Sequence, residues 1–133
     1  MDKVLIVADN TVLLDRLQIE LQKYVGQFEL VTAANGAEAL ALLETERISV
    51  LVTDLEMPQI DGLELLAHMR KYRPQIPCVV MTEPDSPDIT NKADRNSVAG
   101  FITKPVDANA LFALIMEGLE RLDEGLFWRE HRK

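Results

Sequence analysis

Four polar residues in this sequence each follow a short apolar run. They are Asp9, Asp54, Thr82 and Lys104. Carboxylates supply the hard oxygen ligands that Mg²⁺ prefers, and Mg²⁺ also takes phosphate oxygens as ligands. A carboxylate can itself accept a phosphoryl group as an acyl phosphate when a metal, a cation and a hydroxyl neutralise the developing charge. The four side chains together therefore fit phosphoryl transfer to an aspartate.

Five apolar runs rich in β-branched residues predict the strands that would position these side chains. The first, third and fourth runs are apolar at successive positions, which is typical of a parallel sheet covered by helices on both faces. Ligand sites in such sheets lie outside the carboxyl ends of the strands. The pattern indicates a doubly wound α/β fold with the four polar residues at one rim. The runs are Val4–Val7, Phe28–Thr32, Val50–Thr53, Ile76–Met81 and Gly100–Thr103.

Stretches with helical spacing separate the predicted strands, and capping residues stand before them. The fourth helix, over residues 88–98, has few apolar positions for core contacts, and we expect it to be mobile. The predicted openings of the first four helices are Asn10, Asn35 with Gly36, Asp61 with Gly62, and Ser86 with Pro87.

Composition limits the size and the partners of the protein. A chain of 133 residues with 47% apolar content can close one hydrophobic core and is too short for two. Its formal net charge of −8 argues against direct binding to nucleic acid or to an anionic membrane. With Cys78 as the single cysteine and no long apolar run, we expect a soluble, cytoplasmic protein without an internal disulfide.

Four ordered motifs resemble those of response-regulator receiver domains, the phosphoacceptor modules of two-component signalling. Val50–Gly62, with its Met-Pro pair and its Asp-Gly, is similar to the phosphoacceptor strand and the loop after it. Val79–Thr82, Gly100–Pro105 and Val4–Asp9 are similar to the remaining motifs. The resemblance covers residues 3 to about 122, so we expect a receiver domain at 1–122 and a tail or linker start at 123–133. It implies a flavodoxin-like sheet with strand order 2-1-3-4-5.

The resemblance also implies a role for each matching residue. Asp54 would be phosphorylated by a histidine kinase, a phosphotransfer protein or a small phosphodonor. Asp9, Asp54 and the backbone carbonyl of Glu56 would hold Mg²⁺. Lys104 would pair with the phosphoryl oxygens, and its bond to Pro105 is a candidate for the cis form. Thr82 and Phe101 would act as the switch, and an effector or downstream protein would bind the face formed by the fourth helix, fifth strand and fifth helix.

Two positions depart from the receiver pattern. Receivers usually carry two adjacent acids at the end of the first strand, whereas this chain has Ala8 before Asp9. We therefore expect Mg²⁺ to bind about ten- to a hundredfold more weakly. Glu83 follows Thr82, where the family generally has a small residue. Its carboxylate would repel an incoming phosphodonor or, like that of Glu56, would replace the acid lost at Ala8.

Simpler interpretations remain open for several residues. Asp9 competes with Asn10 as the cap of the first helix, and Phe101 fits a packing role as well as a switch role. Cys78, His68 and His131 carry no ligand spacing. Phe112 and Met116, like Phe127 and Trp128 in the tail, fit either packing or a partner surface such as a homodimer contact.

Three other functions compete with a phosphorylation-controlled switch. One is a phosphorylation-independent receiver that serves as an interaction or dimerisation module. Ala8 and Glu83 are compatible with it, whereas the presence of Asp54, Thr82 and Lys104 argues against it. An aspartyl-phosphate phosphatase would need a second aspartate two positions after its nucleophile, where this chain has Glu56. A flavodoxin-like flavin carrier would need a Ser/Thr/Gly-rich phosphate loop, which residues 9–15 lack.

Overall fold

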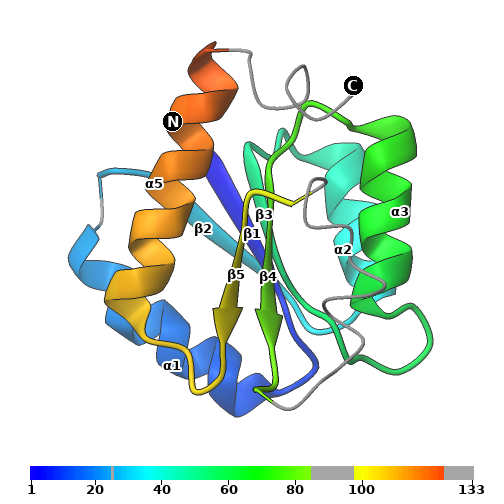
Figure 1. Cartoon of the computed structure of the whole chain (residues 1–133), viewed down its shortest axis with the longest axis horizontal. Helices are drawn as coiled ribbons and strands as arrows, with labels where there is room; N and C mark the ends of the chain where they lie inside the picture. Colours follow the sequence, from blue (N-terminus) through cyan, green and yellow to red (C-terminus); the bar gives the residue numbers. More distant parts are fainter. Residues whose placement is uncertain (25, 85–97, 125–133) are drawn as a thin grey trace.

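The chain forms a central parallel sheet with helices on both faces, as seen in a computed structural model (Figure 1). The structure describes residues 1–24, 26–84 and 98–124. Its strands lie in the order β2-β1-β3-β4-β5, and every neighbouring pair is parallel. The predicted doubly wound, flavodoxin-like α/β fold is confirmed.

Each of the five strands begins and ends within two residues of its predicted position. The continuous apolar runs of β1, β3 and β4 are buried on both faces, as a covered parallel sheet requires. The largest differences are at β4, which begins two residues later than its apolar run because Ile76 and Pro77 precede the ladder. The strands are β1 Lys3–Val7, β2 Glu29–Ala33, β3 Val50–Asp54, β4 Cys78–Thr82 and β5 Gly100–Thr103.

Side-chain caps begin the helices at the predicted residues. The side chains of Asn10, Asn35 and Asp61 accept hydrogen bonds from backbone N–H groups three residues further on. Asp107 caps α5 in the same way, by accepting from Ala110 N at 2.9 Å, and the sequence analysis missed it. The helices are α1 Thr11–Leu21, the 3₁₀ turn η1 Gln22–Tyr24, α2 Gly36–Thr45, α3 Gly62–Tyr72 and α5 Ala108–Glu124.

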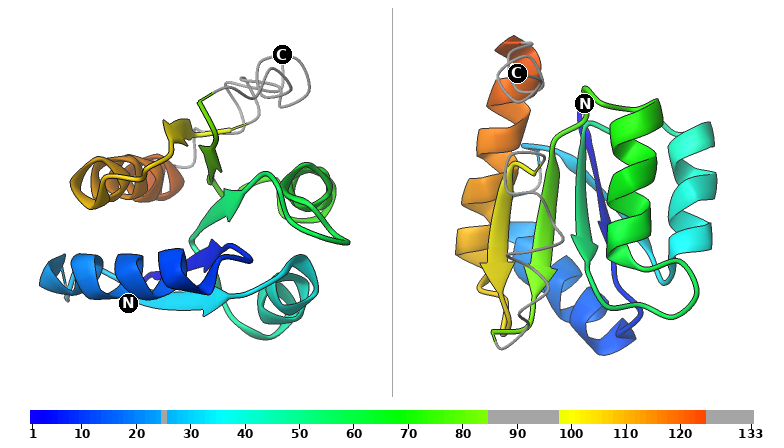
Figure 2. Two further views of the ribbon diagram at one scale, coloured as in Figure 1. Left: turned by 90° about the horizontal axis from the view of Figure 1, so that it is seen from below. Right: turned by 45° about the vertical axis from the view of Figure 1, so that its right-hand side comes forward.

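Two hydrophobic clusters, one on each face of the sheet, hold the layers together. Figure 2 shows α1 and α5 on one face and α2 and α3 on the other. Alternate residues of β1 enter opposite clusters: Val4 and Ile6 pack with α1 and α5, whereas Leu5 and Val7 pack with α2 and α3. This alternation follows from the strand geometry, in which successive side chains point to opposite faces. The sheet is therefore packed against helices on both faces, which fixes the relative positions of the carboxyl ends of its strands.

Phe112 and Met116 on α5 are partly buried against the first of these clusters. The ring of Phe112 stacks on Tyr24, with the ring centroids 3.6 Å apart, and also faces Phe28 at 6.1 Å. The Tyr24 hydroxyl donates to Asn109 Oδ1 at 2.5 Å. These contacts favour the packing interpretation of Phe112, with η1 and the residue before β2 as its neighbours.

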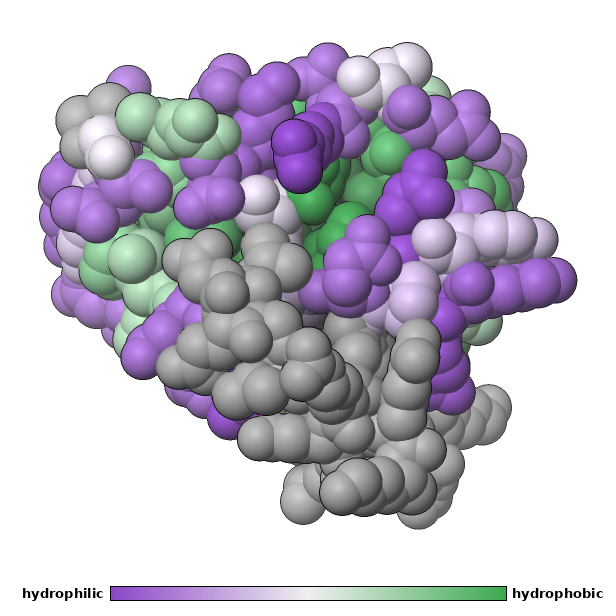
Figure 3. Space-filling view, turned by 90° about the horizontal axis from the view of Figure 1, so that it is seen from above, coloured by the Kyte–Doolittle hydropathy of each residue, from purple (hydrophilic) through white to green (hydrophobic). Residues whose placement is uncertain are grey.

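Among the coloured residues, the face at the amino ends of the strands mixes hydrophilic residues with hydrophobic ones near its centre (Figure 3). Lys3 pairs with Glu46 at 2.6 Å, and the Ser49 hydroxyl donates to Asp2 at 3.0 Å. The Ser49 N–H also donates to the Lys3 carbonyl at 2.8 Å. These bonds join the start of β1 to the segment that enters β3, so they have a structural role.

Several predictions fall outside the described residues. They are the fourth helix with its Ser86–Pro87 opening and its expected mobility, and the tail with Phe127, Trp128 and His131. In the described part of the chain, α5 continues to Glu124, two residues past the predicted boundary. No helix within the ranges that the structure describes is long and apolar enough to cross a membrane.

Gly62 offers a test of how tightly α3 packs on β3. A Cβ at this position would lie 2.3 Å from the carbonyl oxygen of Asp54 and 2.6 Å from Leu55 Cα. Gly62→Ala should therefore lower the free energy of unfolding by about 1–3 kcal/mol, as measured by urea denaturation.

Gly118→Ala is the matched control in α5. Its Cβ would meet the side chains of Pro77 and Val50 at 3.4 Å, an ordinary contact, and alanine favours the helix by about 1 kcal/mol. This variant should be at least as stable as wild type. Equal stability of Gly62→Ala and wild type would contradict the close approach.

Candidate functional site

The sheet register brings the predicted site residues to one rim. Asp54 lies opposite Met81, Thr82 lies opposite Thr103, and the Lys104 N–H donates to the Thr82 carbonyl at 2.8 Å. Val7 lies opposite Thr53, so Ala8 and Asp9 follow β1 at the same end. Because all five strands are parallel, side chains distant in sequence converge at these carboxyl ends.

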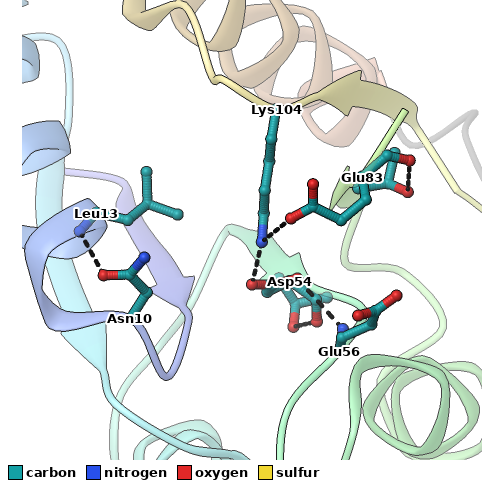
Figure 4. Close-up of polar contacts among 8 residues, drawn as sticks. Asn10, Leu13, Asp54, Glu56, Glu83 and Lys104 are labelled. Atoms are coloured by element: carbon teal, nitrogen blue, oxygen red, sulfur yellow. Dashed lines mark hydrogen bonds and ion pairs between the residues drawn. The ribbon is translucent and has the colours of Figure 1, made fainter. Parts of the chain in front are cut away.

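Asp54 is a buried carboxylate with a donor on each oxygen (Figure 4). Its residue is only 3% exposed. Lys104 Nζ donates to Oδ2 at 2.6 Å, and the Glu56 N–H donates to Oδ1 at 3.2 Å. Burying a carboxylate is costly unless it is paired and hydrogen-bonded, and both conditions are met here. Asp54 does not cap the next helix, because Asp61 has that role.

Lys104 reaches Asp54 from the end of β5, across the end of β4 (Figure 4). Its side chain is 20% exposed. Burial alone would lower the pKa of Lys104, but the hydrogen bond that Lys104 donates to Asp54 and the charges of Asp54 and Glu83 outweigh it and raise the pKa above the ordinary 10.5. The ammonium therefore stays charged throughout the neutral range. Its peptide bond to Pro105 is cis.

Glu83 lies on the other side of Lys104 from Asp54. Its Oε1 is 3.5 Å from Lys104 Nζ, and its side chain is about half exposed. In the side-chain arrangement seen here, Glu83 contacts the cation of the site (Figure 4). The sequence analysis expected Glu83 at this rim, as a charge that repels a phosphodonor or replaces the missing acid. It missed the contact with Lys104, which depends on side-chain geometry.

Thr82 is buried at the end of β4. Its hydroxyl donates to the carbonyl oxygen of Glu83 at 3.3 Å, a long hydrogen bond for two oxygens. Rotation of the side chain toward Asp54 would break this weak bond. Phe101 on β5 is half-buried and packs against the cluster shared with α2 and α3.

The end of β1 carries one acid, Asp9. Ala8 is fully buried and contributes no oxygen, whereas Asp9 is exposed. The cap of α1 is Asn10, so the capping alternative for Asp9 is wrong. Within the described ranges, no group of three His, Cys, Asp or Glu residues is placed to hold a metal ion.

The remaining donors still suit Mg²⁺, which keeps several waters and is held in proteins by one or two carboxylates together with phosphate oxygens. Asp54 and Asp9 would provide the carboxylates, and Glu56 would provide its backbone carbonyl. The family model of the response regulator receiver domain matches residues 4–116 of this chain.

The chain belongs to the response regulator receiver domain family. It is 35% identical over 131 residues to the Escherichia coli transcriptional regulatory protein GlrR, covering 96% of this chain and 29% of GlrR. It is 34% identical over 113 residues to the Pseudomonas aeruginosa response regulator FleR, covering 85% of this chain and 24% of FleR. The receiver therefore spans less than a third of these two relatives.

Solved receiver structures share its fold. A CheY-like receiver from Methanospirillum hungatei superimposes with a TM-score of 0.83 at 28% identity, covering 93% of this chain and 98% of that one. TrrA from Thermotoga maritima, solved in complex with Mg²⁺ and BeF, gives a TM-score of 0.76 at 25% identity, covering 88% and 98%.

Replacing Lys104 tests the buried pair of the receiver. Lys104→Met should lower the free energy of unfolding by about 1–3 kcal/mol, because the buried carboxylate of Asp54 loses its ionic partner. In Asp54→Asn/Lys104→Met, part of this loss should be recovered. Urea denaturation of both single variants, the double variant and wild type gives the coupling energy.

The pH dependence of this loss has a defined sign. Because folding raises the pKa of Lys104 above 10.5, its stabilisation is complete below that pH and is lost as the pH rises through the raised pKa. The difference in the free energy of unfolding between wild type and Lys104→Met should stay constant from neutral pH to about pH 9. A difference that disappears within that range would contradict the assignment.

Proposed function

We propose that this receiver is a phosphorylation-controlled switch in which a histidine kinase or a phosphotransfer protein phosphorylates Asp54. The observation that carries the proposal is the buried Asp54 carboxylate, held at 2.6 Å by Lys104 at the carboxyl rim of the sheet. A carboxylate in that position can attack phosphorus while a fixed cation stands ready to neutralise the oxygens that gain charge.

The transfer step balances without a further reactant. A carboxylate oxygen of Asp54 attacks phosphorus, and the bond between phosphorus and the donor breaks with its electron pair leaving on the donor. From acetyl phosphate the leaving group is acetate, and no proton is needed. From a phosphohistidine the leaving imidazole nitrogen takes up a proton. Lys104 and the Glu56 N–H already contact the Asp54 oxygens, so they orient the nucleophile.

Mg²⁺ would supply charge neutralisation and an in-line template for the phosphoryl oxygens. In this proposal Asp9, Asp54 and the Glu56 carbonyl hold it. Support comes from the donor set and from TrrA, whose structure contains Mg²⁺ and BeF. With Ala8 in place of an acid, we expect the affinity to be lower than in receivers with both acids.

The switch would operate through β4 and β5. Thr82 would turn its hydroxyl from the Glu83 carbonyl to the phosphoryl group, and Phe101 would change rotamer with it. Both residues are on the strands that adjoin Lys104 and α5. Phosphorylation would thereby shift a two-state equilibrium of this face, which an effector domain or a downstream protein reads.

The wider context of the receiver also belongs to the proposal. GlrR is a transcriptional regulatory protein, which supports an effector of that kind for this receiver. We propose residues 1–122 as the receiver and 123–133 as a tail or linker start. A cytoplasmic location and possible homodimer contacts stay predictions of the same kind.

Ala8 gives a specific reason to keep a second candidate. A receiver that binds metal weakly could work as a phosphorylation-independent interaction module. Identical partner binding by wild type and Asp54→Asn would favour this second function over the first.

Phosphorylation itself is the direct test. Incubation with acetyl phosphate and Mg²⁺ should add one phosphoryl group, which intact-mass spectrometry detects and hydroxylamine removes, as for an acyl phosphate. Asp54→Asn should abolish the adduct. Asp15→Asn, an exposed acid on α1, is the control and should behave as wild type. An adduct that survives in Asp54→Asn would refute the assignment.

The expected low affinity for Mg²⁺ can be tested by placing an acid at position 8. One residue beyond the Val7–Thr53 pair, a carboxylate at position 8 would lie on the strand beside Asp54, at about 5 Å strand spacing. Ala8→Asp should therefore bind Mg²⁺ about ten- to a hundredfold more tightly in calorimetric titration. It should also be less stable than wild type in EDTA, because two carboxylates then repel each other.

Two further variants complete this titration. Ala8→Asn has a similar shape without the charge and should stay near the wild-type affinity. Glu83→Ala tests whether Glu83 replaces the missing acid, in which case binding weakens. Unchanged affinity in both Ala8→Asp and Glu83→Ala would remove both explanations.

A further inference from the structure

Lys104 is shared by two carboxylates of different character. The contact to Asp54 is short, at 2.6 Å, and is made by a side chain only 4% exposed. The contact to Glu83 is longer, at 3.5 Å, and its side chain is 52% exposed. When a third anionic group enters the site, the Glu83 contact is the one that can be given up, because its carboxylate can return to water.

A phosphoryl group on Asp54 would be such an anionic group. It carries a charge of about −1.5 to −2 and three acceptor oxygens, and it would need the Lys104 ammonium as its counter-charge. Glu83 is then a like charge within a few ångströms of the new group. Like charges at this distance repel, and the half-exposed side chain of Glu83 can relieve the repulsion by moving away.

The backbone of Glu83 is linked to the same event through Thr82. The Thr82 hydroxyl donates to the Glu83 carbonyl at 3.3 Å. If Thr82 turns toward the phosphoryl group, it releases that carbonyl. Both the side chain and the backbone of Glu83 therefore lose a partner in the same step.

We propose that Glu83 is a specificity-determining residue that occupies Lys104 in the unphosphorylated receiver, disfavours small phosphodonors of high negative charge, and is released when Asp54 is phosphorylated. The inference rests on the proposed function, since it requires Asp54 to be the acceptor. It assigns the class of donor that the site disfavours, and it places Glu83 on the cation of the site.

The test compares phosphorylation rates at low ionic strength and saturating Mg²⁺. With acetyl phosphate, which carries two negative charges at neutral pH, Glu83→Gln should react about three- to tenfold faster than wild type. Glu83→Asp keeps the charge and should stay closer to wild type than Glu83→Gln does. Glu44→Gln is the matched control, because it changes the net charge equally on an exposed residue of α2 and should leave the rate unchanged.

Two readouts separate an electrostatic role from a merely structural one. The increase in phosphorylation rate of Glu83→Gln over wild type should be smaller with phosphoramidate, which carries less negative charge. It should also shrink as salt screens the repulsion between Glu83 and the phosphodonor. Thermal unfolding of Glu83→Gln establishes that the fold is kept, and Glu83→Ala serves as a second variant.

The outcomes distinguish this inference from the function on which it rests. Equal rates for wild type, Glu83→Gln and Glu44→Gln would overturn the role of Glu83 and leave phosphorylation of Asp54 intact. A slower Glu83→Gln would also overturn it, because Glu83 would then assist transfer. If wild type itself gains no phosphoryl group, the proposed function fails first.

Discussion

The buried ion pair between Asp54 and Lys104 is the interaction on which the site depends. The two residues are 50 positions apart, and their strands are separated by β4. Lys104 Nζ and Asp54 Oδ2 come within 2.6 Å of each other because the strand order of the sheet places β3 and β5 on either side of β4. Because the Asp54 carboxylate is almost fully buried, its charge must be balanced within the protein. A change of charge on Asp54 therefore acts directly on Lys104, which follows β5.

The two unusual residues of this receiver redistribute charge around that pair. Ala8 removes an acid from the β1 side of Asp54, and Glu83 adds one on the β4 side. The number of acids near Asp54 is thus the same as in a receiver with two acids at the end of the first strand. The added acid, Glu83, contacts Lys104 at 3.5 Å. The site therefore has fewer carboxylates to bind Mg²⁺, and its own cation, Lys104, contacts two carboxylates.

Sequence patterns predicted the sheet because burial on both faces leaves a continuous apolar run, and they predicted three caps because Asn and Asp bond locally to the backbone. The rim residues followed from the parallel topology. The Glu83–Lys104 contact and the Tyr24–Phe112 stack could not be predicted in this way, because they depend on side-chain positions across distant elements. The Asp107 cap was overlooked although its local signal was present.

The two sides of Asp54 differ in how far they can adjust. On the α3 side, Gly62 leaves no room for a Cβ against the Asp54 carbonyl, and its N–H donates to the Leu55 carbonyl at 2.9 Å. That side is close-packed backbone and resists displacement. On the β4 side stand an exposed glutamate and a threonine hydroxyl with a weak bond. A new charge on Asp54 would be accommodated where movement costs least, so the response should run through β4 and β5 while α3 keeps the nucleophile in place.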